Sequence, residues 1–277
     1  RHNLMAPSDA VGLIAGNGQF PLLFAQAAKE QGVRVVAVAM EGETNPEIAN
    51  HVDVCSFVKV GQLGRMIKFF HKHSITQAAM AGGVRKTRLF EGARPDLTAV
   101  KLLAQSALKQ DDGMLRAIAR EFESKGITII DSTLYMPECL APAGLLTSNA
   151  IDSKTESELS YGYEVARKIG ELDIGQTVIV KGGAVVALEA IEGTDACIER
   201  AGNLTQQSGA VAVKIAKPDQ DMRFDVPAIG ITTIENLSRA GIKVLGVEAG
   251  RTLFLEPQKI IQRADELGVT IVGLTPG

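Results

Sequence analysis

The first half of the chain alternates between two patterns of apolar residues. Short apolar runs, which are typical of buried strands, cover 11–15, 33–40, 52–58, 78–81 and 128–130. Between them apolar positions recur every three or four residues, which predicts amphipathic helices over 21–31, 63–73, 97–108 and 114–125. Strands that alternate with helices predict an α/β domain with a parallel sheet and right-handed crossovers.

The second half has shorter apolar runs, some of them joined by tight turns. Strands at 177–180 and 185–190 flank the turn 181–184, whose paired glycines are typical of a β-hairpin. The same two patterns predict strands at 210–216, 243–248 and 252–255, and helices at 154–169, 232–240 and 257–267. We therefore expect a mixed α+β domain in this half.

Two domains are predicted, joined by an irregular segment. With 277 residues, of which 45% are hydrophobic, the chain can fill two ordinary cores. Pro137, Pro142 and Gly144 interrupt any periodicity between the two halves. We place the N-terminal domain at 5–133, the linker at 134–150 and the C-terminal domain at 151–277. Because ligands gather at domain interfaces, we expect one in the crevice between these domains.

The composition argues against several classes of function. A net charge of −3 and a pI of about 5.9 disfavour nucleic-acid binding, which needs a basic stripe on the surface. Cys55, Cys139 and Cys197 are far apart and lack zinc-ligand spacing, so we expect small buried hydrophobes in a reducing cytosol. No apolar stretch approaches the ~20 residues of a membrane span. We therefore expect a cytoplasmic protein.

The most informative segment is 214–225, KIAKPDQDMRFD, which follows an apolar run and should form a loop. It contains three basic and three acidic side chains: Lys214, Lys217, Arg223, Asp219, Asp221 and Asp225. The basic groups can neutralise phosphate oxygens, and crowded carboxylates can recruit Mg²⁺ and orient or deprotonate a water. If the backbone is extended, the three carboxylates point to the same side and can converge on one cation. The alternative is a solvated turn whose charges pair locally.

A second polar turn follows the strand predicted at 185–190. It carries Glu189, Glu192, Thr194 and Asp195 ahead of a short helix predicted over 196–201. Thr194 or Asp195 can cap that helix, and capping alone would account for one of them. Glu192 has no such explanation, which favours a role in binding.

Glycine turns end several strands of the first half. Gly16-Asn17-Gly18-Gln19 resembles the start of a dinucleotide fingerprint, but Pro21 stands where the third glycine is expected. Glu41 follows the second strand, where an NAD enzyme places its ribose-binding acid, so an NAD(P)-dependent oxidoreductase stays open as an alternative. Gly61-Gln62 and Gly82-Gly83 end the next strands, and Arg85 follows the latter pair, which favours an anion nearby.

Seven blocks together resemble the LpxI-type UDP-2,3-diacylglucosamine pyrophosphatases of lipid A biosynthesis in Gram-negative bacteria. The resemblance runs from about residue 11 to residue 272. The blocks are GLIAGNG at 12–18, VGQLG at 60–64, RPDL at 94–97, DD at 111–112, EAIEGTDA at 189–196, KPDQDMRFDVP at 217–227 and EAGRT at 248–252. One departure follows Gly83, where the chain reads Val84-Arg85-Lys86 and related chains often have a proline after the arginine.

The resemblance implies an N-terminal Rossmann-like parallel-sheet domain and a distinct C-terminal α+β domain that carries the acidic loop. It also implies a cytosolic, Mg²⁺-dependent hydrolase that splits UDP-2,3-diacylglucosamine into UMP and 2,3-diacylglucosamine 1-phosphate (lipid X). The final aspartate of the acidic block is regarded as catalytic in the family, and here it falls on Asp225.

These inferences define a predicted site. The catalytic residues are predicted to be Asp225, Asp221 and Asp195, and Asp225 and Asp221 are predicted to hold Mg²⁺, with Mn²⁺ as an alternative. The predicted substrate-binding residues are Gly16, Asn17, Gly18, Gln19, Gln62, Gly82, Gly83, Arg85, Glu192, Thr194, Lys214, Lys217, Gln220 and Arg223. The expected partner is a small lipid-linked nucleotide sugar and not nucleic acid. Peripheral contact with the inner membrane, a homo-oligomer and a non-catalytic nucleotide-sugar-binding protein stay open.

Overall fold

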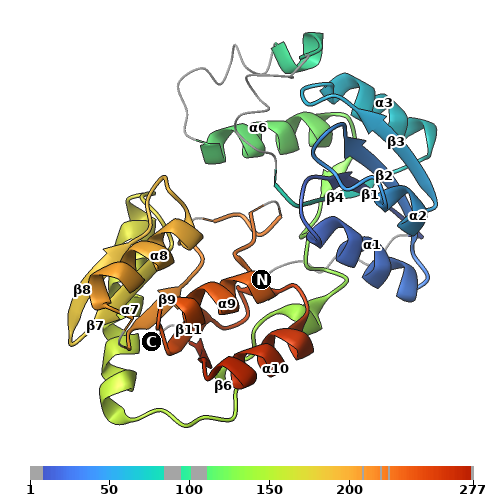
Figure 1. The fold of residues 1–277 in the computed structure, drawn as a ribbon. Helices are drawn as coiled ribbons and strands as arrows, with labels where there is room; N and C mark the ends of the chain where they lie inside the picture. Colours follow the sequence, from blue (N-terminus) through green and yellow to red (C-terminus); the bar gives the residue numbers. More distant parts are fainter. Residues whose placement is uncertain are drawn as a thin grey trace. The chain divides into compact units, whose positions relative to one another are not determined.

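The structure, a computed structural model, describes residues 9–83, 95–100, 111–207, 209–218, 220–223 and 225–275 (Figure 1). These residues form two compact units. The first contains the chain up to Met136 together with Met222–Phe224, and the second contains Pro137–Asp221 and Asp225–Gly277. In the described ranges, no helix has both the length and the apolar character that crossing a bilayer requires.

The first unit is built on a parallel sheet whose strands run in the order β3-β2-β1-β4-β5. This order, in which the chain reverses direction across the sheet after β3, is that of doubly wound α/β folds. The predicted Rossmann-like fold is confirmed. The strands are β1 (Ala10–Ala15), β2 (Arg34–Met40), β3 (Val54–Val58), β4 (Gln77–Ala81) and β5 (Thr128–Ile129).

Helices cover both faces of this sheet. Those described are α1 (Phe20–Glu30), α2 (Ile48–His51), α3 (Leu63–Lys72) and α6 (Asp111–Ser124). Phe24 of α1 and Ile48 of α2 pack with Leu13 against one face, whereas Phe70 of α3 and Phe122 of α6 pack with Ile14 against the other. Successive strand residues point to opposite faces, which explains why both Leu13 and Ile14 are apolar. Residues 111–113, which we expected before the helix, lie within α6.

The loops after β1 and β4 meet through their backbones. Asn17 N donates to Gly83 O (2.7 Å), and the two residues form an isolated antiparallel bridge. A Cβ atom on Gly16 would lie 2.4 Å from Gly83 O, and one on Gly82 would lie 2.2 Å from Asn17 O. These glycines are therefore required by the approach of the two loops, whatever they bind.

The second unit contains a mixed sheet and a separate strand pair. The mixed sheet runs β6-β13-β11-β9-β7-β8; β13, β11 and β9 are parallel, and β6, β7 and β8 are antiparallel to their neighbours. β10 pairs with β12. The strands are β6 (Gly144–Leu145), β7 (Thr177–Lys181), β8 (Ala184–Leu188), β9 (Val211–Lys214), β10 (Ala228–Ile229), β11 (Val244–Glu248), β12 (Leu253–Phe254) and β13 (Thr270–Leu274).

Helices cover this sheet on both faces as well (Figure 1). The helices of this unit are η1 (Pro137–Cys139), α7 (Ser153–Glu171), α8 (Thr194–Thr205), α9 (Ile231–Arg239) and α10 (Pro257–Leu267). α8, α9 and α10 share one apolar cluster with Ile179 and Leu245, and α7 packs with Val178 and Val213 on the opposite face. The predicted α+β character of this half is confirmed. The strand β13, which we did not predict, adds an edge to β11 and joins it to β6.

The cysteines are free thiols. Cys197 is buried, and burial raises the pKa of its thiol to about 12, so it behaves as an inert core residue. Cys55 and Cys139 are only half-buried, which corrects the expectation that all three are core residues.

Candidate active site

A buried lysine lies at one end of the second sheet. Lys214 is the last residue of β9, and only 7% of it is exposed. Its Nζ donates to Thr194 Oγ1 (3.2 Å), at the start of α8, and to Ala228 O (3.3 Å), in β10. The carboxyl ends of parallel strands are where α/β sheets bind ligands, so this lysine marks a candidate site.

The negative charges of three carboxylates act on the Lys214 ammonium: Glu189, Asp195 and Asp225. Burial lowers the pKa of Lys214, and the negative charges of these three residues oppose that shift. Glu189 is itself buried and accepts a hydrogen bond from Thr194 Oγ1 (3.1 Å). The Thr194 hydroxyl therefore accepts a hydrogen bond from Lys214 and donates one to Glu189, which links the two charged groups. A buried ammonium needs compensation of this kind.

Strand register brings Glu189 to Lys214. Thr177 of β7 lies opposite Lys214 of β9, and Glu189 N donates to Thr177 O (2.8 Å). Glu189, directly after β8, thus lies beside Thr177 of β7, which in turn lies beside Lys214 of β9. Residue spacing does not predict this arrangement, because β7 lies between β8 and β9 in the sheet.

The turn before α8 differs from the prediction. The helix begins at Thr194 and not at residue 196, and its N-cap is Gly193, with no side-chain cap. Neither Thr194 nor Asp195 therefore caps the helix. Glu192, which we expected to bind substrate, forms an ion pair with Arg200 (2.6 Å) and accepts from Ala190 N (3.1 Å). These contacts give Glu192 a structural explanation that the sequence did not suggest.

The acidic loop is folded into turns. Gln220 N donates to Lys217 O (3.0 Å), and Lys217 N donates to Gln220 Oε1 (2.8 Å). Asp225 N donates to Asp221 O (3.0 Å). The extended conformation that we assumed for this loop is therefore wrong for the residues described, whereas Asp219 lies outside them. Within the described part of the chain, no three His, Cys, Asp or Glu side chains lie close enough to form a metal site.

The two other basic side chains of the loop are paired with carboxylates. Lys217 Nζ lies 2.5 Å from Asp173 Oδ1 in the second unit. Arg223 Nη1 donates to Glu123 Oε1 of α6 (2.9 Å) in the first unit. Both pairs are partly exposed, so an anionic ligand can compete with these carboxylates for the basic groups.

Glu248 and Arg251 hold the start of the loop through contacts that were not predicted from the sequence. Glu248, the last residue of β11, is 4% exposed, and its Oε2 accepts from Ala216 N (2.9 Å). Arg251 lies 3.5 Å from Glu248 Oε1 and donates to Lys217 O (3.4 Å). Both residues stand in the EAGRT block, but nothing in that block indicated which backbone groups they would bind.

Replacing Glu248 with leucine is expected to destabilise the fold by about 1–3 kcal/mol, because the buried Ala216 N–H loses its acceptor. It should also lower turnover, because the acidic loop starts at this bond. Urea unfolding and steady-state kinetics measure the two effects. Glu171→Gln, on an exposed carboxylate paired with Arg167, is the control and should change neither. Unchanged stability in the leucine variant would contradict the anchoring role.

The predicted residues of the first unit lie around the loops after β1, β3 and β4. Asn17 Nδ2 donates to Glu43 Oε2 (3.2 Å), and Gln62 Oε1 accepts from Lys59 N (3.0 Å). Gln19 is the N-cap residue of α1 without a capping side-chain bond, and Gly18 has a positive φ of 85°. Arg85 lies outside the described residues. The structure thus groups Gly16–Gln19 with Gly82 and Gly83 through the bridge described above.

Comparison with known proteins identifies relatives over nearly the whole chain. A model of the LpxI N-terminal domain matches residues 10–139, and a model of the LpxI C-terminal domain matches residues 142–272. The UDP-2,3-diacylglucosamine pyrophosphatase LpxI of Caulobacter vibrioides is 32% identical over 276 residues, which cover 96% of this chain and 98% of that protein.

Solved structures give weaker similarities. CobK precorrin-6A reductase is 10% identical, with a TM-score of 0.31, over 97% of this chain and 88% of that one. The biotin carboxylase domain of a thermophilic 2-oxoglutarate carboxylase bound to ADP is 17% identical, with a TM-score of 0.28, over 63% of this chain and 36% of that one. With TM-scores this low, these structures do not define the fold of this chain.

Proposed function

The chain belongs to the LpxI family, and from this premise we propose that it hydrolyses the pyrophosphate bond of UDP-2,3-diacylglucosamine. The products are UMP and 2,3-diacylglucosamine 1-phosphate (lipid X), in lipid A biosynthesis. The observation that carries the proposal is the similarity, over 96% of this chain, to a pyrophosphatase that is named for this substrate. The polar cluster around Lys214 lies within the range that the LpxI C-terminal model matches.

In this mechanism Asp225 orients a water molecule and accepts its proton as the oxygen attacks. A bond forms between the water oxygen and one phosphorus of the anhydride, and the bond from that phosphorus to the bridging oxygen breaks. The bridging oxygen leaves with the other phosphate, so no covalent intermediate with the protein is needed. Asp195, in the first turn of α8, helps to position the water.

Asp221 and Asp225 are the residues that would hold Mg²⁺ or Mn²⁺. Their backbone hydrogen bond keeps them in one turn, and Mg²⁺ is commonly bound by one or two carboxylates together with substrate phosphates. This donor set fits a divalent ion without a third carboxylate. When bound, the ion would neutralise charge on the phosphate oxygens.

Positive charge for the diphosphate comes from Lys214, Lys217 and Arg223. Lys217 and Arg223 would exchange their carboxylate partners, Asp173 and Glu123, for phosphate oxygens. Lys214 is buried and acts at a distance, because its own hydrogen bonds go to Thr194 and Ala228. Such fixed charges stabilise the charge that develops in phosphoryl transfer.

The remaining predicted residues bind the polar parts of the sugar nucleotide in this proposal. In the N-terminal domain these are Gly16, Asn17, Gly18, Gln19, Gln62, Gly82, Gly83 and Arg85. The lipid substrate would bring the protein to the inner face of the inner membrane as a peripheral contact. Sedimentation with vesicles that contain the substrate, compared with vesicles without it, measures that contact.

The decisive assay follows UMP release from UDP-2,3-diacylglucosamine. Purified protein should release UMP with Mg²⁺ present and stop releasing it when a chelator is added in excess. Water labelled with ¹⁸O shows which phosphorus is attacked, since the label appears in only one product. Binding without UMP release, with Mg²⁺ or Mn²⁺ supplied, would instead identify a nucleotide-sugar-binding protein. The oxidoreductase alternative predicts nicotinamide binding, and neither the domain models nor the Caulobacter relative supports it.

A further inference from the structure

A hydrogen bond between two helices holds one of the proposed catalytic carboxylates. Asn236 of α9 donates from Nδ2 to Asp195 Oδ1 (3.0 Å) at the start of α8. The two residues are 41 positions apart in sequence, so only the packing of α8 on α9 brings them together. Nothing in the sequence around Asn236 had indicated a role for it.

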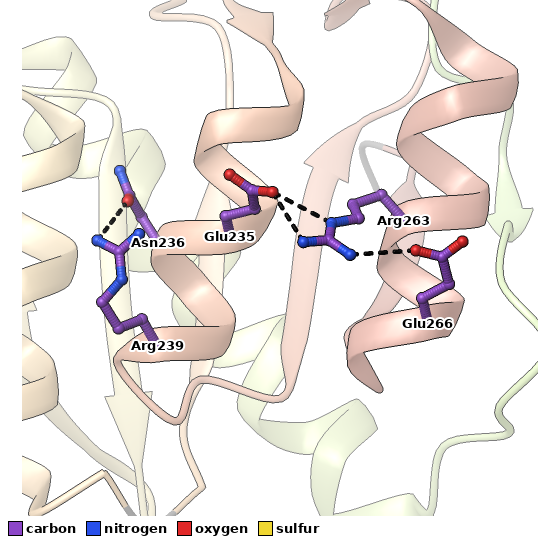
Figure 2. A network of polar contacts seen from close by, with 5 residues as sticks. All are labelled: Glu235, Asn236, Arg239, Arg263 and Glu266. Carbon is purple, nitrogen blue, oxygen red and sulfur yellow. Dashed lines mark hydrogen bonds and ion pairs between the residues drawn. The ribbon is translucent and has the colours of Figure 1, made fainter.

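The Asn236 amide has a fixed orientation. Its Oδ1 accepts from Arg239 Nη1 (3.2 Å), one helical turn further along α9 (Figure 2). Guanidinium groups only donate and ionised carboxylates only accept, so Arg239 must face the amide oxygen and Asp195 must face the amide nitrogen. Asparagine is suited to this position because it can accept from one neighbour and donate to the other.

The residue before Asn236 makes a separate set of contacts. Glu235 Oε1 accepts from Arg263 Nε (3.1 Å) and Nη2 (2.9 Å), and Arg263 also pairs with Glu266 within α10. Figure 2 shows Glu235 directed towards α10, while Asn236 and Arg239 face the opposite side of α9. Glu235 therefore joins two helices without reaching Asp195, which makes it a matched control on the same helix.

We infer that Asn236 is a positioning residue, which holds the Asp195 carboxylate in one orientation at the start of α8. The inference rests on the proposed function, in which Asp195 helps to position the attacking water. Arg239 acts one step further away, because it fixes the orientation of the amide.

Asn236→Leu removes the donor, and Asn236→Asp keeps the acceptor for Arg239 but places a second carboxylate against Asp195. Both variants are expected to lower kcat about tenfold with little change in KM, as expected when one hydrogen bond to a charged group is lost. Glu235→Gln should keep the kcat of the unchanged protein. If the bond only joined α8 to α9, the Asn236 variants would lower the melting temperature and leave kcat unchanged, which would overturn the inference.

A double variant distinguishes the effect of Asn236 from the effect of Asp195 itself. In an Asp195→Asn background, Asn236→Leu should have no further effect on kcat, because the two residues act as one unit. If Asp195→Asn alone keeps full turnover, the proposed role of Asp195 fails, and positioning by Asn236 fails with it. In a third outcome, Asp195→Asn lowers turnover and Asn236→Leu lowers it further in that background by the same factor as in the unchanged protein. In that case Asn236 does not act through Asp195, while the proposed function stands.

Discussion

Asp225→Asn is expected to lower kcat by about 10²–10⁴-fold, with substrate binding retained. An amide of the same size cannot accept the proton of the attacking water. General-base catalysis contributes about 10²–10⁴-fold to the rate, so we expect a loss of that size. The Asp225 N–H that bonds to Asp221 O belongs to the backbone and is kept, so the turn should stay intact. Steady-state release of UMP measures kcat, and calorimetric titration with the unreacted sugar nucleotide measures binding.

Asp152→Asn is the control for this substitution. Asp152 caps α7 by accepting from Thr155 N (2.8 Å), and asparagine is an equally good cap, so the control should keep both stability and turnover. Near-normal turnover in Asp225→Asn would refute the role of Asp225 as the base. A loss of substrate binding that is as large as the loss of kcat would assign Asp225 to binding instead.

Lys214→Met is expected to lower the free energy of unfolding by about 1–3 kcal/mol and to lower turnover as well. Methionine fills much of the same space but has no ammonium, so Thr194 Oγ1 and Ala228 O both lose this buried donor. Chemical denaturation measures the loss. Lys259→Met, on a 67% exposed side chain paired with Glu256, should cost less than about 1 kcal/mol. Equal effects of the two substitutions would show that the buried hydrogen bonds of Lys214 do not stabilise the fold.

The pH dependence of stability provides a second test of Lys214. Burial lowers the pKa of its ammonium from the ordinary value of 10.5. Between the lowered value and 10.5, the unfolded chain binds more protons at this position than the folded chain does. The contribution of Lys214 to stability therefore rises with pH across that window. Lys214→Met should lack this slope when the free energy of unfolding is measured at increasing pH.

Local patterns were sufficient to predict the class of fold. The strands of the first unit are short apolar runs between amphipathic helices, and their parallel pairing follows from that alternation. β13 was missed because its five residues are a short apolar run at the end of a helix, without the turn residues that mark the hairpin of β7 and β8. Its place between β11 and β6 depends on pairing with residues far away in sequence.

The chemistry of the site was predictable only in part. A dense group of charges drew attention to 214–225, but the sequence did not show that Lys214 is buried and the other two basic residues are paired at the surface. Glu189, Glu248 and Asn236 act through partners on other strands or helices. Strand order and helix packing determine those partners, and neither can be read from residue spacing.

The division of the chain into units limits where the protein can be divided into two separately produced fragments. Met222–Phe224 belong to the first unit, although the sequence on both sides of them belongs to the second. A single break after Met136 would leave the amino-terminal fragment without these residues, and Arg223 would be encoded apart from its partner Glu123. Two fragments produced separately should therefore regain a complete first unit only when they are mixed, which makes the protein a candidate for fragment complementation.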